Sequence, residues 1–144
     1  MKKILVLLFL IFSTIALFGC TNESSNTKDP SSTFKAGSYE MIGEEGKLGF
    51  IYDEQGPPFI PGEGNKYMWH FWGDVSEGDS LKVVGTNQDT GEEEVIIDDI
   101  VLGGAHNTAD AHTPSSMSVP SEGIWELDAY INNNLFGTVV VETK

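Results

Sequence analysis

Two of the three histidines in the chain lie close together in the segment 103–118, with a carboxylate between them. His106, Asp110 and His112 offer two imidazoles and one carboxylate, a donor set that zinc and other divalent ions accept. A fourth, open coordination position would hold an activated water. The spacing matches no metal signature, and the segment is predicted to be a loop. We therefore expect structural loop histidines, with Asp110 capping a turn, and no metal or other cofactor; metal binding is the alternative.

The third histidine lies in the most apolar run of the chain, residues 66–72, between Trp69 and Phe71. Apolar residues occupy both parities of this run, which is typical of a central strand buried on both faces. We expect His70 to be a hydrogen-bonded residue of the core. If His70 and Trp72 point outward instead, they form an exposed aromatic ledge for a partner.

A proline-rich segment, residues 55–62, is a second candidate for partner binding. Pro57, Pro58 and Phe59 would lie in an exposed polyproline-like stretch that a partner could recognise. The plainer interpretation is a loop that crosses between two sheets.

Composition and motifs argue against catalysis and against nucleic acid. The chain has no Gly-x-Ser-x-Gly nucleophile elbow and no phosphate-cradling glycine loop. Its eight basic residues are all lysines, against 22 acidic residues, and the formal net charge is −14. Such a chain repels nucleic acid and anionic headgroups, and it lacks the arginine forks that grip phosphate.

The N-terminus has the pattern of an export signal. Lys2 and Lys3 precede an almost wholly apolar run, residues 4–18, that is short for a membrane span. The following Leu17-Phe18-Gly19-Cys20 resembles the bacterial lipobox. That resemblance implies cleavage before Cys20 and a diacylglyceryl group, carrying fatty acids such as palmitate, on its sulfur. The protein would then sit on the outer face of the cell membrane, held by two acyl chains.

The remainder divides into a tether and one domain. Residues 1–19 are the predicted signal peptide, 20–37 the lipidated cysteine with a polar, flexible tether, and 38–144 the folded domain. About seven short strands separated by turns predict an all-β, immunoglobulin-like β-sandwich. Alternation in the last two strands predicts inward-facing side chains at four positions, namely Trp125, Leu127, Val139 and Val141.

Four strings in this domain resemble a known family. They are 39–52, 66–73, 109–117 and 125–139, which include Lys-Tyr-Met-Trp-His-Phe-Trp-Gly and Trp-x-Leu-Asp-Ala-Tyr. They are similar to lipoprotein domains of unknown function from spore-forming Gram-positive bacteria. The resemblance implies the fold and a membrane address but no chemistry.

The function that we predict is a lipid-anchored, non-catalytic binding or accessory module outside the cell membrane. It would present a sandwich face or its loops to an envelope or protein partner. Two alternatives remain open: a metal-binding or metal-dependent envelope protein that uses the 103–118 loop, and an inhibitor of extracytoplasmic proteases.

Overall fold

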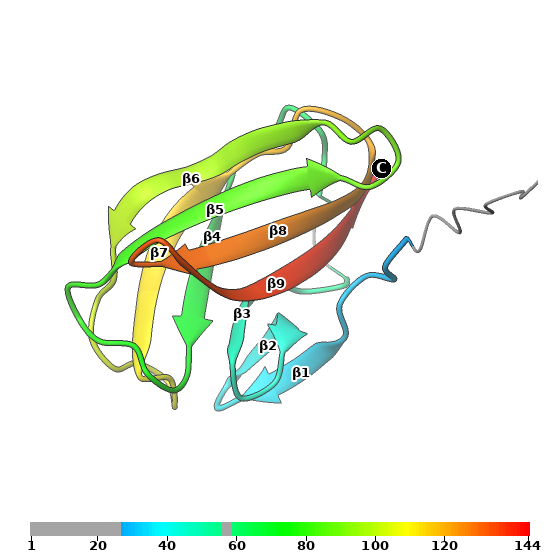
Figure 1. Cartoon of the computed structure of the whole chain (residues 1–144). Helices are drawn as coiled ribbons and strands as arrows, with labels where there is room; N and C mark the ends of the chain where they lie inside the picture. Colours follow the sequence, from blue (N-terminus) through cyan, green and yellow to red (C-terminus); the bar gives the residue numbers. More distant parts are fainter. Residues whose placement is uncertain (1–26, 56–58) are drawn as a thin grey trace, which may run out of the picture.

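The computed structural model describes residues 27–55 and 59–144, which form two antiparallel sheets packed face to face (Figure 1). The all-β sandwich is therefore confirmed, with nine strands in the described residues where about seven were predicted. One sheet contains β1 (Thr33–Ala36), β2 (Tyr39–Glu44), β3 (Leu48–Ile51), β4 (Asn65–Phe71) and β7 (Ala111–Met117), in that order. The other contains β6 (Glu93–Val101), β5 (Ser80–Asn87), β8 (Gly123–Ile131) and β9 (Asn134–Thr143).

The two sheets enclose one hydrophobic core. In Figure 1 the strands β4 and β7 run steeply across β5 and β8, so the strand directions of the two packed sheets cross. The register places Trp125 opposite Val141 and Leu127 opposite Val139, and all four are buried. The predicted inward face of the last hairpin is confirmed. In the described residues the members of this core lie between residues 42 and 141, so the part from Thr27 onward supplies a hydrophobic core.

Strand β4 explains why the run 66–72 is apolar on both parities. It lies between β3 and β7 in the interior of its sheet, as predicted. Trp69 and Phe71 point into the core and are fully buried. His70 points to the outer face, and it too is fully buried because other residues cover that face.

Short turns connect the strands of two hairpins. Glu45, Gly46 and Lys47 connect β2 to β3. Asn132 and Asn133 have φ values of 49° and 65° between β8 and β9. A two-residue turn that joins right-twisted strands needs positive φ at both positions, and asparagine tolerates it better than most residues.

The domain begins earlier than the sequence indicated, because β1 falls within the predicted tether 20–37. Phe34 and Ala36 alternate with polar residues over only four positions, too few for a strand to be recognised. Ser31 also binds β9: its N–H donates to the carbonyl of Val140 at 2.9 Å, and its hydroxyl accepts from the Val140 N–H at 2.9 Å. Pairing with β2 and β9 thus orders a segment whose composition is typical of a disordered chain.

The predicted loop 103–118 is wrong in its second half, since β7 occupies Ala111–Met117. Pro114 lies inside this strand. A proline is compatible with an edge strand, and β7 is the edge of its sheet.

The predicted signal peptide, Cys20 and the start of the tether lie outside the described residues, as do Pro57 and Pro58. In the described ranges, no helix is long and apolar enough to cross a membrane.

Candidate functional site: a histidine cluster beside an aromatic pocket

The structure brings all three histidines together on the outer face of the first sheet. His70 of β4 and His112 of β7 are paired across the strands, with ring centroids 6.3 Å apart. His106 comes from the segment between β6 and β7, and its ring lies 4.7 Å from that of His112 and 5.7 Å from that of His70. His106 and His112 are close in the sequence, whereas His70 enters the cluster only through the β4–β7 pairing.

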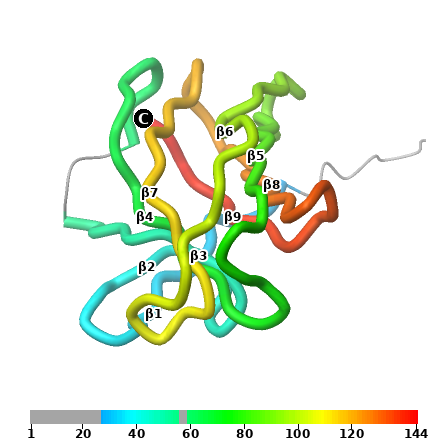
Figure 2. Tube along the Cα trace, turned by 90° about the vertical axis from the view of Figure 1, so that its left-hand side faces the viewer, coloured from blue at the N-terminus to red at the C-terminus, as the bar shows by residue number. Residues whose placement is uncertain are grey.

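The segment 103–110 carries His106 over this face and is fixed at both sides. The Asn107 side-chain amide donates to the carbonyl of Ala36 at 2.8 Å, which attaches the segment to the β1–β2 turn. The Gly73 N–H donates to the Asp110 carboxylate at 2.7 Å, which attaches it to the end of β4. Figure 2 shows this yellow segment beside the cyan β1–β2 turn at one end of the molecule.

The tip of this segment is a tight turn with unusual backbone angles. His106 and Ala109 exchange two backbone hydrogen bonds, of 3.1 and 2.9 Å. The two residues between them, Asn107 and Thr108, have φ values of 43° and 73°. A β-branched residue in this left-handed region is a true outlier with a cost of order 1–3 kcal/mol. The tip therefore stores strain that its surroundings hold in place.

Hydrogen bonds fix the tautomers of two of the rings. Nδ1 of His70 lies 3.2 Å from the carbonyl of Met68, and Nδ1 of His112 lies 2.6 Å from the carbonyl of Gly104. A carbonyl only accepts, so Nδ1 carries the hydrogen in both rings. Nε2 of His70 is then an unprotonated acceptor, and it is buried without a hydrogen-bond partner among the described residues.

The environment of His70 opposes its protonated form. Burial lowers the pKa of His70 below the ordinary value of 6.5, and the neighbouring His106 and His112 lower it further. The hydrogen bond to the Met68 carbonyl acts in the opposite direction and is outweighed. The ring is consequently neutral at physiological pH.

The alternative of a metal site at His106, Asp110 and His112 gains no support from the geometry. The carboxylate of Asp110 accepts from the Gly73 N–H, which is the turn-fixing role expected of it. Among the residues that the structure describes, no group of three or more His, Cys, Asp and Glu side chains is arranged to hold a metal ion. We therefore assign none of these residues as a metal ligand.

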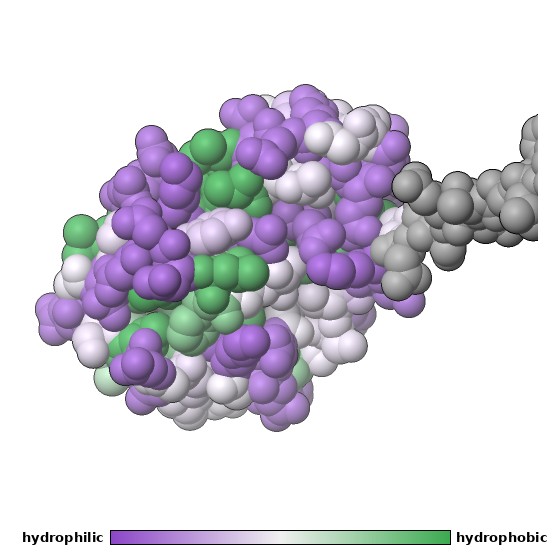
Figure 3. All heavy atoms as spheres, viewed as in Figure 1, coloured by the Kyte–Doolittle hydropathy of each residue, from purple (hydrophilic) through white to green (hydrophobic). Residues whose placement is uncertain are grey.

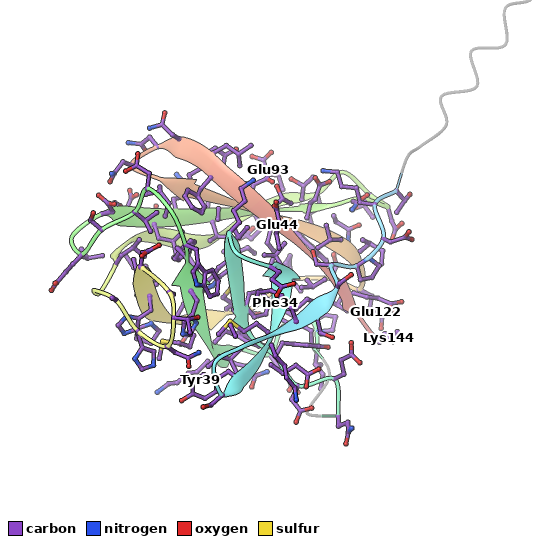
Figure 4. The ribbon with its side chains drawn as sticks, turned by 90° about the horizontal axis from the view of Figure 1, so that it is seen from below. Phe34, Tyr39, Glu44, Glu93, Glu122 and Lys144 are labelled. Atoms are coloured by element: carbon purple, nitrogen blue, oxygen red, sulfur yellow. The ribbon has the colours of Figure 1, made fainter. Side chains whose placement is uncertain are left out.

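An aromatic pocket adjoins the cluster. Trp72 stacks on His70 at 6.1 Å with an interplanar angle of 25°, and Phe34 meets Trp72 edge to face at 6.1 Å. Phe34 leans over Gly49 of β3, where a Cβ would lie 3.0 Å from the Phe34 ring. Figure 4 shows Phe34 on the β1–β2 hairpin and Tyr39 near the turn of that hairpin.

This pocket, the Phe34–Trp72 pocket, has a volume of about 290 Å³. Its lining combines the two rings with small, charged and loop residues: Phe34, Lys35, Ala36, Gly37, Glu45, Gly46, Trp72 and Thr108. Trp72 is half-buried, so the ledge predicted from His70 and Trp72 exists only in part. Trp72 reaches the surface, whereas His70 lies beneath it.

A second pocket, of about 390 Å³, lies beside the N-terminal segment, and Phe59 is one of its lining residues. Phe59 is only 2% exposed and stacks on Tyr67 at 5.1 Å. Its predicted place on an exposed recognition loop is therefore wrong, because its ring packs into the core. Elsewhere, Figure 3 shows apolar patches among polar side chains on the face seen in Figure 1. The exposed large hydrophobic residues include Val95, Val101 and Leu135.

Fold and site together define the class: a small all-β sandwich domain with a histidine cluster and an aromatic pocket at one end of its first sheet. The chain belongs to the family described as Domain of unknown function (DUF4871), whose model matches residues 18–141. The family expected from the sequence is thus supported as one of unknown function.

A solved structure shares the fold. It is an X-ray crystal structure of "a Putative Lipoprotein from Bacillus anthracis", with a TM-score of 0.62 and 20% sequence identity. The match covers 81% of this chain and 86% of that chain. The search of curated proteins found no match.

Proposed function

We propose that this chain is a lipid-anchored, non-catalytic binding module that takes a neutral sugar unit into the Phe34–Trp72 pocket. The observation that carries the proposal is the half-buried indole of Trp72, which lines a pocket with charged groups at its margin. An aromatic ring held in this way offers a flat apolar surface on which the C–H face of a sugar can pack.

The margin of the pocket supports a polar ligand. Lys35 and Glu45 are exposed and line it, supplying an ammonium donor and a carboxylate acceptor for hydroxyl or amide groups. A pocket of about 290 Å³ lies at the small end of the usual range for ligand sites, so it suits one sugar ring better than an extended chain.

Charge favours a neutral ligand over an anionic one. The chain carries a net charge of −14, and its six lysines beyond the signal face 22 acidic residues. An anionic polymer would be repelled at long range. A neutral glycan of the cell envelope meets no such barrier.

The predicted lipid anchor supports a location of the domain on the outer face of the cell membrane. The lipobox-like Leu17-Phe18-Gly19-Cys20 precedes the first contacts of the ordered domain by only a few residues, since Lys28 already pairs with Glu126 of β8. Lys28 lies eight residues after Cys20, a stretch that can span at most about 29 Å, so a lipid on Cys20 would hold the domain close to the bilayer.

An NMR titration tests this function. The domain from Thr27 onward is titrated with the N-acetylglucosamine disaccharide, and amide shifts are followed. We expect perturbations concentrated at the pocket lining, and their loss in Trp72→Ala. Tyr130→Ala is the matched control, because Tyr130 is a half-buried aromatic residue on the other sheet. Perturbations absent from the pocket, or equal in both variants, contradict the proposal.

A further inference from the structure

The three histidines form a graded path from solvent to the protein interior. His106 is exposed, His112 is half-buried and His70 is fully buried. Their rings are neighbours throughout, at 4.7, 5.7 and 6.3 Å. A proton that arrives at the surface ring therefore lies next to two further imidazoles, and the innermost one has an unpartnered nitrogen.

Protonation of this cluster has no compensating charge at hand. The side chains that face His70 are Tyr39 of β2 at 6.5 Å, Trp72, His106 and His112, while β3 contributes only Gly49 opposite it. The charged groups that shift the pKa of His70 are His106 and His112, and both disfavour its protonated form.

Two acids belong to the covering segment or adjoin it, and neither contacts the His70 ring. Asp110 is bound to the Gly73 N–H, and Glu77 lies beside Gly104 of the covering segment. Two protonated imidazoles in the cluster would repel each other strongly, because the cluster is partly buried and water screens the charges poorly. A protonated Nε2 of His70 would also be a buried donor without an acceptor, which costs the full desolvation of that group.

The covering segment is the element beside His70 that carries strained backbone. Strands β4 and β7 are joined by a register of seven paired positions, from Asn65–Met117 to Phe71–Ala111. Segment 103–110 is hydrogen-bonded to its neighbours at Gly103, Gly104, Asn107 and Asp110, but its tip, Asn107 and Thr108, carries strained backbone. Opening this segment hydrates the cluster and releases the strain, while the sandwich core stays intact.

From this geometry we infer that His70, His106 and His112 form an acid-operated latch. Proton uptake at mildly acidic pH detaches segment 103–110 from the outer face of the first sheet. The latch goes beyond the proposed function and does not depend on the ligand of the pocket. It acts on that pocket nonetheless, because Thr108 belongs to both the segment and the pocket lining.

The test is hydrogen exchange on the ligand-free domain from Thr27 onward, expressed as protection factors at about pH 7.5 and about pH 5. We expect protection of the amides of Gly103 and Ala109, both hydrogen-bonded in the closed form, to fall about tenfold or more at the lower pH. Protection of the paired amides of β5 and β8 stays unchanged. The imidazole signals of His70 titrate below pH 6.5 in the same samples.

Variants separate the latch from general acid instability. In His70→Phe the ring remains but cannot take up a proton, so the pH-dependent loss of protection is expected to shrink markedly. His70→Gln serves the same purpose if the phenylalanine variant fails to fold. Equal protection of Gly103 and Ala109 at both pH values overturns the inference. So does a simultaneous loss in β5 and β8, or a latch that opens unchanged in the His70 variants.

Discussion

His70 and His112 are direct neighbours across β4 and β7, with their ring centroids 6.3 Å apart. The pairing places both imidazoles on the outer face of the sheet, where His106 joins them from segment 103–110. The cluster is therefore a product of strand register, and several measurable properties of the domain follow from it.

Stability should fall as the pH drops below about 6.5. The pKa of His70 is lowered in the folded protein, so the unfolded chain binds the proton first. Stability is then fully present above the unfolded value of 6.5 and is lost as the pH falls toward the folded pKa. One proton gives a slope of at most about 1.4 kcal/mol per pH unit. Urea unfolding between about pH 7.5 and 5 measures it. A His70→Phe variant with the same slope as the native domain would contradict this origin.

Thr108→Gly should stabilise the domain. Thr108 has φ of 73°, a region that glycine adopts freely and that a β-branched residue enters at a cost. Relief of that strain, less the added entropy of glycine in the unfolded chain, predicts a gain of about 1 kcal/mol. The urea midpoint checks it. Thr86→Gly within β5 is the matched control and should lose stability. A Thr108→Gly domain that is less stable than the native one would show that the threonine side chain outweighs the strain.

Truncation of Trp125 should damage the core. Trp125 is fully buried, lies opposite Val141 and donates from its indole to the carbonyl of Ser121 at 2.9 Å. Trp125→Ala should cost about 3–5 kcal/mol in the free energy of unfolding, a large share of the stability of a domain. Trp72→Ala, at a half-buried position, should cost clearly less. Equal denaturation midpoints for native and Trp125→Ala domains would exclude this role.

Metal removal should leave the melting temperature unchanged. Asp110 is committed to the Gly73 N–H, so His106 and His112 lack the third ligand that the sequence suggested. Thermal unfolding with a chelator, and with equimolar zinc, measures any stabilisation by mass action. His106→Ala/His112→Ala is the control. Stoichiometric zinc that raises the melting temperature, and is lost in this double variant, would replace our assignment with a metal site.

The anchor is tested at Cys20. Cys20→Ser removes the sulfur that would carry the diacylglyceryl group, so the protein should leave the membrane fraction or accumulate as an uncleaved precursor. Fractionation and the mobility of the product on a gel report both outcomes. Cys20 is the only cysteine of the chain, so Ser13→Ala within the apolar run serves as the control and should be processed normally. Membrane retention and processing of the Cys20→Ser protein equal to the native one would refute the anchor.

The sequence by itself determined the elements of this protein whose signals are local. Alternation placed Trp125 and Leu127 on the inner face, two asparagines marked the turn between β8 and β9, and apolar residues on both parities marked β4 as an interior strand. Each of these three features depends on the spacing of apolar residues or on a turn preference within a few residues, so the local sequence is enough to predict it.

Only the tertiary structure decided which distant residues meet. His70 joins His106 and His112 because β4 pairs with β7, and no local pattern encodes that pairing. The same reason explains β1, a short edge strand ordered by its pairing with β2, and β7, whose Pro114 is compatible only with an edge position. The histidine cluster and the pocket beside Trp72 are thus properties of the assembled sheet rather than of any one segment.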